Sequence, residues 1–407
     1  MIRRNYSRRA LVKFASLSLA LALTQTPAHS YIVETTVPPS GCPAPNHWPV
    51  AGPSSIRLRW SASIAPSTVI TVAPYATAQQ LTEIGEVVQQ SLGAWTGVSG
   101  VLINSSATQS AVAPIAQIAD TNACTNDVES NVDGLNTICF NQSSSAFTND
   151  GVLAFTRVIT ANAPGATIGS APPASFAGQI LDSDTLFNNT GDVTFATPSA
   201  LGTSQGVGAY DLESLLTHEL GHFFGLDHSA VRRAILYPFA PTPGTFIGQR
   251  PTPSAPDAML SDDDRTGLRV LYPDPADSVH IGTIAGRILP ANPFALAAIP
   301  AASAQQPVTG IFGTQVVAED AGTGNIVAAT MGGWSCTNGQ VQFDGSYAIS
   351  RLPVPANYKV YAEPLNGLAT GGDFYETANG ICGGSTTNNC TEPEVNTNFT
   401  TRVRPSP

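Results

Sequence analysis

Twelve residues in the middle of the chain, His-Glu-Leu-Gly-His-Phe-Phe-Gly-Leu-Asp-His-Ser at 218–229, constrain the fold more than any other stretch. On a helix, His218 and His222 are one turn apart and project from the same face. Two imidazoles at this spacing can share one tetrahedral Zn²⁺, and Glu219 beside the first can act as a base on a water held there. The stretch therefore predicts a helix that carries a metal site.

The residues that follow complete a set of three histidines. Gly225 can adopt the left-handed conformation that ends a helix, which brings His228 back as a third ligand. Three protein ligands and one open position are typical of a catalytic zinc site, whereas a structural site is closed by four. The alternative is a buried helix that carries histidines by coincidence, but five fixed identities would recur by chance in about one chain in ten thousand of this length. The motif favours zinc.

Length and charge exclude several kinds of protein. The chain has 407 residues, which is enough for two or three domains with separate cores. Only 12% of the residues are charged, whereas Gly (36) and Pro (32) are abundant, and this predicts short strands and many turns. The formal net charge of −11 argues against binding to nucleic acid or to an anionic membrane surface.

The first thirty residues are typical of an export signal. A basic start is followed by an apolar run at 14–23, and Ala28-His29-Ser30 supplies the small residues that signal peptidase needs. Ten such residues are too few to cross a bilayer, so we expect no transmembrane anchor. The segment 7–13 contains two adjacent arginines and fits either a twin-arginine signal or an ordinary basic start. We therefore predict a secreted protein, extracellular or periplasmic, exported by a Sec or twin-arginine route.

Six cysteines, all beyond the predicted signal, fit an oxidising destination. Their spacings match no zinc-finger pattern, which makes disulfides the default. The simplest local pairs are Cys124–Cys139 and Cys382–Cys390. This leaves Cys42 and Cys336 either paired with each other or unpaired.

Hydrophobic periodicity predicts a mixed unit of helices and strands before residue 277. Alternation at 56–60 predicts a half-buried strand, and the helical period from Leu81 to Trp95 predicts a helix. The other expected elements are a strand that begins at 101–103, strands at 152–158 and 179–181, a zinc helix at 210–224, and a last helix at 261–272 capped by Ser261. This order is that of an α+β fold built on one sheet.

Residues 108–149 are polar, acidic and cysteine-bearing. The acidic side chains there could bind Ca²⁺ as a second ion, although their spacing fits no known calcium loop. A solvated acidic loop explains them more simply. The residues concerned are Asp120, Asp127, Glu129 and Asp133.

From His280 onward the pattern becomes all-β. Short runs split by Gly or Pro predict strands at 315–318, 326–329, 346–349 and 358–362, with an Ala/Pro-rich insertion at 289–307. We place the boundary near residue 277. The predicted organisation is a signal peptide at 1–30, a zinc-site domain at 31–277 and a small all-β sandwich at 278–407.

The zinc stretch resembles the metzincin clan of zinc endopeptidases, whose pattern is HExxHxxGxxH, and within that clan the matrixin family. In matrixins the third histidine is followed by Ser, as at Ser229, then by a Met-Tyr-Pro turn beneath the metal and by a helix that begins Leu-Ser-x-Asp-Asp. This chain has Leu236-Tyr237-Pro238 and Leu260–Asp263 in the matching places, and 180–184 looks like the strand and acidic turn before the zinc helix. The turn methionine is Leu236 here, which is a mild exchange at an apolar position.

The resemblance covers about residues 50–273 and implies a metzincin-type catalytic domain with a mixed twisted sheet, long helices and a zinc cleft. It implies a secreted zinc metalloendopeptidase in which His218, His222 and His228 bind Zn²⁺ and Glu219 is the general base. An extended peptide substrate is then expected against an edge strand at Gly151–Phe155, and the loop 239–258 is expected to wall the cleft. The implied substrate contacts are Val152, Leu153, Ala154 and Phe155, and the implied floor of the site is Leu236, Tyr237 and Pro238.

Two features leave the function open at this stage. Gly41-Cys42-Pro43 is not the cysteine-switch sequence of the family, so a Cys42 thiolate on the zinc is an alternative to a disulfide. The C-terminal part resembles the carboxypeptidase-regulatory-like, transthyretin-like sandwich, which implies an accessory domain that could bind a surface or a polymer. The rivals to a protease are a metal-binding protein without hydrolysis and a secreted adhesion or matrix-binding protein with a weakened zinc site. We expect a polypeptide substrate, no nucleic acid and a monomer.

Overall fold

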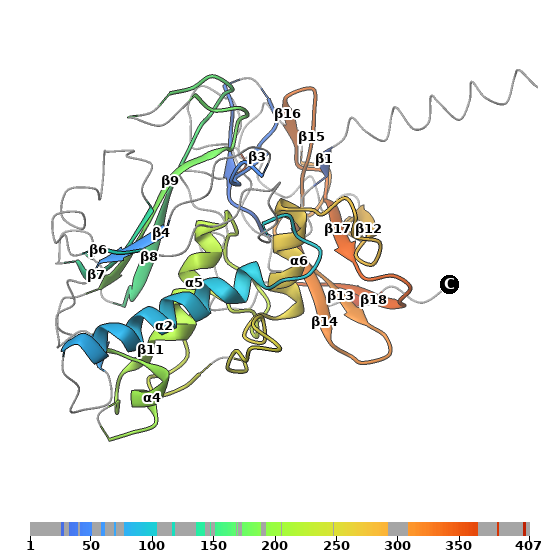
Figure 1. The fold of residues 1–407 in the computed structure, drawn as a ribbon. Coiled ribbons are helices and arrows are strands. Elements are labelled where there is room, and N and C mark those ends of the chain that lie inside the picture. Colours follow the sequence, from blue (N-terminus) through green and yellow to red (C-terminus); the bar gives the residue numbers. More distant parts are fainter. Residues whose placement is uncertain are drawn as a thin grey trace, which may run out of the picture.

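The computed structural model describes residues 26–27, 32–39, 41–50, 58–61, 69–70, 77–103, 116–118, 136–142, 147, 151–167, 169, 173–188, 193–204, 206–246, 248–291, 308–364, 381 and 402–403. Figure 1 shows two regions, a sheet with long helices and a β-rich region drawn in orange and red. The apolar run at 14–23 and the four candidate calcium ligands lie outside the described residues. Among the residues described, no helix combines the length and the apolar character needed to span a bilayer.

A five-stranded sheet forms the frame of the first region, in the order β6-β4-β7-β9-β8. Its strands are β4 (Leu58–Ser61), β6 (Ala116–Ile118), β7 (Asn136–Gln142), β8 (Ala154–Thr160) and β9 (Ile180–Asn188). The pairs β4–β6, β4–β7 and β7–β9 are parallel, whereas β8 runs antiparallel to β9 at the end of the order. The mixed sheet predicted from the sequence is confirmed.

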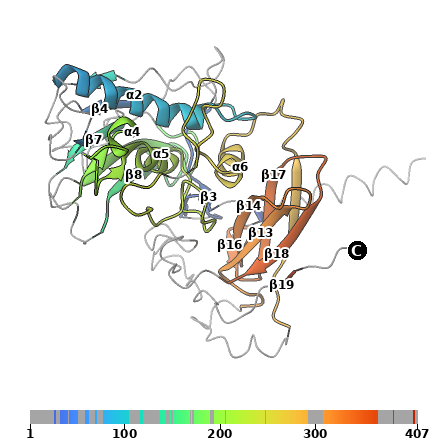
Figure 2. The ribbon, with the colours of Figure 1, turned by 90° about the horizontal axis from the view of Figure 1, so that it is seen from below.

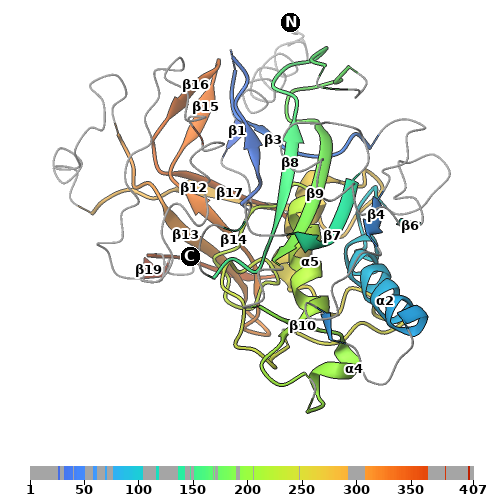
Figure 3. The ribbon, with the colours of Figure 1, turned by 90° about the vertical axis from the view of Figure 1, so that its left-hand side faces the viewer.

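Two long helices pack together next to this sheet, α2 (Thr77–Thr96) and α5 (Leu212–Phe223). Figure 3 shows both helices beside the strands β4, β7 and β9. Trp95, fully buried on α2, donates its indole N–H to the carbonyl of Thr217 on α5 at 2.8 Å. The helical apolar period of α2 therefore positions the zinc helix through one shared core.

The last helix of this region, α6 (Asp262–Leu271), begins where the sequence predicts. Ser261 caps it, because its hydroxyl accepts from the backbone N–H of Asp264 while the Asp264 carboxylate accepts from the backbone N–H of Ser261. After the helix, Tyr272 is fully buried and its hydroxyl donates to the carbonyl of Phe224 at 2.7 Å. The helix is thus tied at its end to the end of α5.

Small elements complete the first region. The three-stranded sheet β11-β10-β5 and the short helix α4 lie near the start of α5, and the two-stranded sheet β2-β3 lies in the N-terminal segment. Their bounds are β2 (Thr35–Thr36), β3 (Ala44–Pro45), β5 (Val69–Ile70), β10 (Phe195–Ala196), α4 (Pro198–Leu201) and β11 (Tyr210–Asp211).

Two sequence predictions of local structure are wrong. Val101 does not begin a strand but makes a single bridge to Pro273, because the chain turns there against the end of α6. The segment 180–184 contains no acidic turn, since all five residues are buried within β9. Asp184 faces the neighbouring strand, and its carboxylate accepts a hydrogen bond from the backbone N–H of Thr137 at 2.8 Å. This partner compensates for the burial of a carboxylate that the sequence pattern predicts to be exposed.

Among the described residues from 282 onward, the regular secondary structure consists of strands only, as predicted. The strands are β12 (Gly282–Arg287), β13 (Thr314–Asp320), β14 (Ile326–Gly332), β15 (Ser335–Thr337), β16 (Gln340–Gln342), β17 (Ser346–Leu352), β18 (Tyr358–Glu363) and β19 (Arg402–Val403). They make the sheets β14-β13-β18-β19 and β12-β17, and β15-β16 is extended by β1 (Thr26–Pro27). The boundary at 277 and the transthyretin-like assignment stay predictions.

A disulfide cross-links the two regions. Cys42 and Cys336 form a disulfide across a sequence separation of 294 residues, so the paired alternative for these two cysteines is confirmed. Figure 2 shows α6 between the remainder of the first region and the strands of the second. Cys139 is also disulfide-bonded, but Cys124, Cys382 and Cys390 lie outside the described residues, so the two local pairings stay predictions. Because Cys42 is held in a disulfide, the Cys42 thiolate is excluded as a zinc ligand.

Candidate active site

The three histidines of the motif converge on one point. His218 and His222 lie one turn apart on α5, with their Nε2 atoms 3.2 Å apart. His228 joins them after Gly225, whose φ of +89° is the predicted left-handed turn. One ligand atom from each of the three residues lies within 4.8 Å of the others.

This geometry fits Zn²⁺. Two nitrogens bound tetrahedrally to one Zn²⁺ at the usual bond length lie about 3.3 Å apart, which matches the Nε2–Nε2 distance of His218 and His222. The described part of the chain brings no fourth ligand to these three imidazoles, which leaves room for a water or a substrate oxygen. The residues present can therefore hold a catalytic zinc ion.

Hydrogen bonds fix which nitrogen of each helical histidine faces the site. The Nδ1–H of His218 donates to the carbonyl of Ile235, and that of His222 donates to the carbonyl of Leu226, both at 2.8 Å. The opposite nitrogens are therefore available as ligands. Burial lowers the pKa of His218 to about 3, and His228 adds to this effect. Burial also holds the pKa of His222 well below its usual value, and the other two histidines lower it further. Both imidazoles are thus neutral, as ligation requires.

Glu219 lies beside the histidines and is 4% exposed. Burial raises the pKa of its carboxyl to about 8, and a hydrogen bond from Thr156 opposes this rise. A divalent cation at the three histidines would also favour the carboxylate, because an opposite charge stabilises the ionised form. The carboxyl is therefore poised between its two protonation states near neutral pH, which suits a general base.

Thr156 is a site residue that sequence reasoning missed. Its hydroxyl donates to Oε2 of Glu219 at 2.8 Å, and the hydroxyl of Thr185 lies 2.9 Å from it. Thr156 lies on β8, which packs against α5, and its hydroxyl also lies 3.0 Å from the backbone carbonyl oxygen of Glu219. The only signal in the sequence was its place in the predicted strand 152–158, directly after the four predicted substrate contacts, and the motif gives no indication of a partner 63 residues away.

A cleft of about 600 Å³ opens in front of the histidines. Its lining comes from the N-terminal segment, the edge strand, the zinc helix and the loop after it: residues 33–35, 151–156, 210, 214–215, 218–219, 222, 227–228, 235 and 237–241. The four predicted substrate contacts, Val152 to Phe155, all line it, although only Ala154 and Phe155 belong to β8. The contribution of residues 33–35 was not anticipated from the sequence.

The floor of the site is built around Leu236. This side chain is fully buried, and a Cβ atom added at Gly221 would meet its Cδ2 at 2.6 Å. Leu236 therefore packs against the zinc helix between His218 and His222 and fills the volume beneath them. Tyr237 and Pro238, which follow it, turn into the cleft and line it.

The predicted wall of the cleft is anchored by Arg250. Phe239, Ala240 and Pro241 line the cleft at the start of the loop 239–258. Farther along the loop, the Arg250 guanidinium binds Asp211 at 2.7 Å and Glu213 at 2.5 Å, both at the start of α5. Burial raises the pKa of Glu213, and the charge of Arg250 opposes that rise. This ion pair holds the loop against the zinc helix.

Comparison with known proteins shows which family the site region resembles. Residues 163–273 match the family Matrixin. The chain is 35% identical over 109 residues to Metalloendoproteinase 1 of Glycine max, 37% over 95 residues to Metalloendoproteinase 1-MMP of Arabidopsis thaliana, and 33% over 105 residues to Matrix metalloproteinase-25 of Homo sapiens.

These matches cover 27%, 21% and 26% of this chain and 30%, 23% and 16% of the respective relatives. The chain therefore spans less than a third of the curated relatives it matches. The matched segment contains the zinc helix, the third histidine, the turn at Leu236 and α6. The matched segment carries the three-histidine site, and over these residues the chain is matrixin-like.

Proposed function

We propose that the protein is an exported zinc-dependent metalloendopeptidase that cleaves polypeptides in the cleft above α5. The observation that carries the proposal is the convergence of His218, His222 and His228 beside the buried carboxyl of Glu219. A site that only stores metal does not need a carboxyl at that place. Two of the relatives named above are called metalloendoproteinases and the third a matrix metalloproteinase, which supports this proposal.

The protein's own residues divide the reaction between them. The chemistry that Zn²⁺ supplies at such a site is polarisation of the scissile carbonyl and acidification of the attacking water. Glu219 takes a proton from that water as the oxygen attacks the carbonyl carbon, and then delivers the proton to the nitrogen of the leaving amine as the C–N bond breaks. The hydroxyl of Thr156 holds the Glu219 carboxyl in the orientation that both transfers require.

The substrate is expected to bind as an extra strand. β8 is the last strand in the sheet order, and its first residues line the cleft together with Gly151 to Leu153. An extended peptide can add to such an edge through main-chain hydrogen bonds. The apolar lining from Leu215, Ile235 and Phe239 suits an apolar side chain of the substrate.

Removal of the metal tests the proposal. The purified protein is expected to cut an unstructured protein substrate at internal bonds, to lose this activity with a zinc chelator, and to regain it when Zn²⁺ is added back. Mass spectrometry of the products locates the new termini. Cleavage that persists after complete removal of the metal would show that the proposed function is wrong.

Thr156→Val is expected to lower kcat about tenfold, because the lost charge-assisted hydrogen bond contributes about 1.5 kcal/mol to the orientation of Glu219. KM and zinc content are expected to change little, because valine has nearly the shape of threonine at this one cleft-lining position and the three histidines are untouched. Thr156→Ser, which keeps the hydroxyl, is the matched control and should retain most of the rate. Equal kcat values for the Val and Ser variants would refute the positioning role of this hydroxyl.

A further inference from the structure

One carboxylate joins residues 228–236, the zinc loop that follows α5, to the C-terminal strands. Asp263 on α6 is 1% exposed. Its Oδ2 accepts from the hydroxyl of Ser229 at 2.5 Å, and its Oδ1 accepts from the backbone N–H of Ala329 on β14 at 2.6 Å. Ser229 directly follows the third zinc-site histidine. Two hydrogen bonds, both to Asp263, therefore link Ala329 on β14 to Ser229, the residue after His228.

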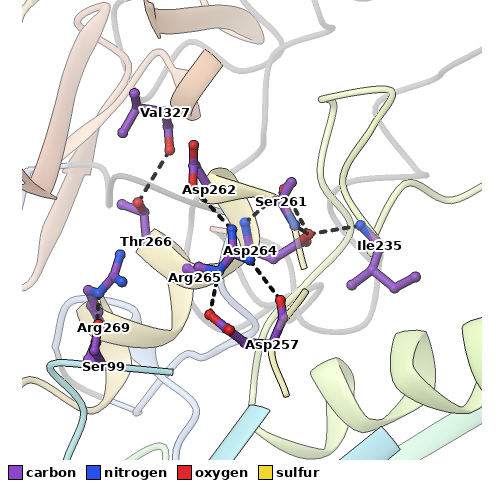
Figure 4. A network of polar contacts seen from close by, with 10 residues as sticks. All are labelled: Ser99, Ile235, Asp257, Ser261, Asp262, Asp264, Arg265, Thr266, Arg269 and Val327. Atoms are coloured by element: carbon purple, nitrogen blue, oxygen red, sulfur yellow. Dashed lines mark hydrogen bonds and ion pairs between the residues drawn. The ribbon is translucent and has the colours of Figure 1, made fainter. Parts of the chain in front are cut away.

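The loop on the zinc side is held by α6 at both ends. The Ser229 N–H donates to the carbonyl of Leu236 at 2.8 Å, and the Ser229 hydroxyl accepts from the N–H of Val231 at 3.1 Å. At the other end, the Asp264 carboxylate accepts from the N–H of Ile235 at 2.9 Å, as Figure 4 shows. The carbonyl of Ile235 in turn orients His218. The contacts of this loop with α6 thus help to position two of the three histidines, His218 and His228.

The C-terminal strands cover the side of the zinc loop that faces away from the histidines. Val231 and Ala234 of the zinc loop form a buried cluster with Val317 of β13 and Ala329 of β14. Beside it, the hydroxyl of Thr266 on α6 donates to the carbonyl of Val327 at 3.3 Å (Figure 4). Without these strands the cluster would face water, and Asp263 would lose one of its two hydrogen-bond donors.

The carboxyl of Asp263 needs both donors because it is buried. Burial raises its pKa to about 8, and the hydrogen bonds from Ser229 and Ala329 oppose this rise. Losing a donor leaves one oxygen of a buried carboxyl without a hydrogen bond, which costs free energy, and this cost favours a shift of the side chain towards another donor. Any such movement displaces Ser229, the neighbour of His228.

We propose that the C-terminal β-strands are a structural part of the metal site, in which the N–H of Ala329, acting through Asp263 and Ser229, fixes the loop that carries His228. Asp263 is a positioning residue in this scheme, since it touches neither metal nor substrate. The inference rests on the proposed function only in assuming that the three histidines bind zinc. It assigns the C-terminal strands a role in metal affinity.

Two variants break the two ends of this link, and a third serves as a matched control. Ser229→Ala removes the hydroxyl that donates to Asp263. Ala329→Pro removes the backbone donor; β14 is the end strand of its sheet and this N–H faces α6, where proline is tolerated. Thr266→Val removes another hydrogen bond between α6 and β14 without touching the zinc loop.

The measurement is the dissociation constant for Zn²⁺, obtained on the full-length protein by competition with a chromogenic chelator. Ser229→Ala and Ala329→Pro are each expected to weaken zinc binding about tenfold, as is usual for changes around metal ligands. Thr266→Val should bind zinc like the unaltered protein. The double variant Ser229→Ala/Ala329→Pro should be little weaker than either single variant, because both break the same chain of contacts. The absorption spectrum of the Co²⁺-substituted protein should change in the same two variants.

Several results would overturn the inference. One is unchanged zinc affinity in both variants, and another is an equal loss in all three, which would indicate general loosening of the interface. If Ala329→Pro does not fold, Ser229→Ala against Thr266→Val decides alone. In these cases the protein still binds zinc, so the proposed function stands. An unaltered protein that binds no zinc would refute both.

Discussion

Glu219→Gln is expected to lower the rate of peptide hydrolysis by about 10²–10⁴-fold, the usual contribution of a general acid–base group. The amide cannot take a proton from the attacking water, although it has the size and shape of the carboxyl that it replaces. Zinc content should not change, because the three histidines and their backbone partners are untouched. The measurement is kcat/KM on a peptide substrate, with zinc determined in the same preparation.

Glu86→Gln provides the matched control, since it makes the same chemical change at an exposed position of α2. It should leave both the rate and the zinc content unaltered. If Glu219→Gln kept full activity with zinc bound, Glu219 would not be the base, and the proposed mechanism would be wrong.

Gly225→Ala is expected to abolish zinc binding and to lower the free energy of unfolding by about 3 kcal/mol. Gly225 has a φ of +89°, and an added Cβ atom would lie 2.0 Å from the carbonyl oxygen of Asn46. That oxygen belongs to a segment held in place, because the N–H of Asn46 donates to the carbonyl of Glu34 and the N–H of Glu34 donates to the carbonyl of Gly225. The turn must therefore move, and His228 moves with it.

Gly165→Ala separates backbone strain from the steric clash. Its φ of +79° is equally left-handed, but among the described residues, apart from its chain neighbours, no atom lies within 4 Å of the added Cβ. We expect a loss of only about 1–2 kcal/mol and normal zinc binding for this variant. Thermal unfolding and zinc analysis of the two proteins check the difference. Similar behaviour of both variants would mean that the contact with Asn46 does not fix the turn.

Local chemistry explains why the site could be predicted. The spacing of His218 and His222 needs only a helix, and the positive φ needs only Gly225, so both features follow from the sequence itself. The cap at Ser261 is equally local, because the side chains involved lie three residues apart. Each of these predictions depends on contacts within a few residues.

The errors occur where distant residues decide the outcome. Asp182 and Asp184 are typical of a turn, but β9 lies between two strands and buries them, with Asn136 and Thr137 of β7 beside them. Thr156 reaches Glu219 only because β8 packs against α5. No periodicity in the sequence carries this information.

The attachment of the C-terminal strands to the zinc-site region could not be predicted from the sequence. Composition and periodicity predict an all-β region, and the described strands agree with that. Its attachment depends on Asp263 and Ala329, which are 66 residues apart, and on a disulfide between residues 294 positions apart. The sequence alone favoured a separate accessory domain, whereas the structure brings this region to the helix that supports the zinc loop.

Titration of the metal-free protein with Zn²⁺ tests the central claim most directly. Bound zinc and the rate of peptide cleavage are followed in the same samples. We expect the rate to rise in proportion to bound zinc and to level off at one ion per chain, since the three histidines form one site. A protein that binds no zinc, or that binds one zinc ion per chain without any cleavage of unstructured polypeptides, would contradict the account.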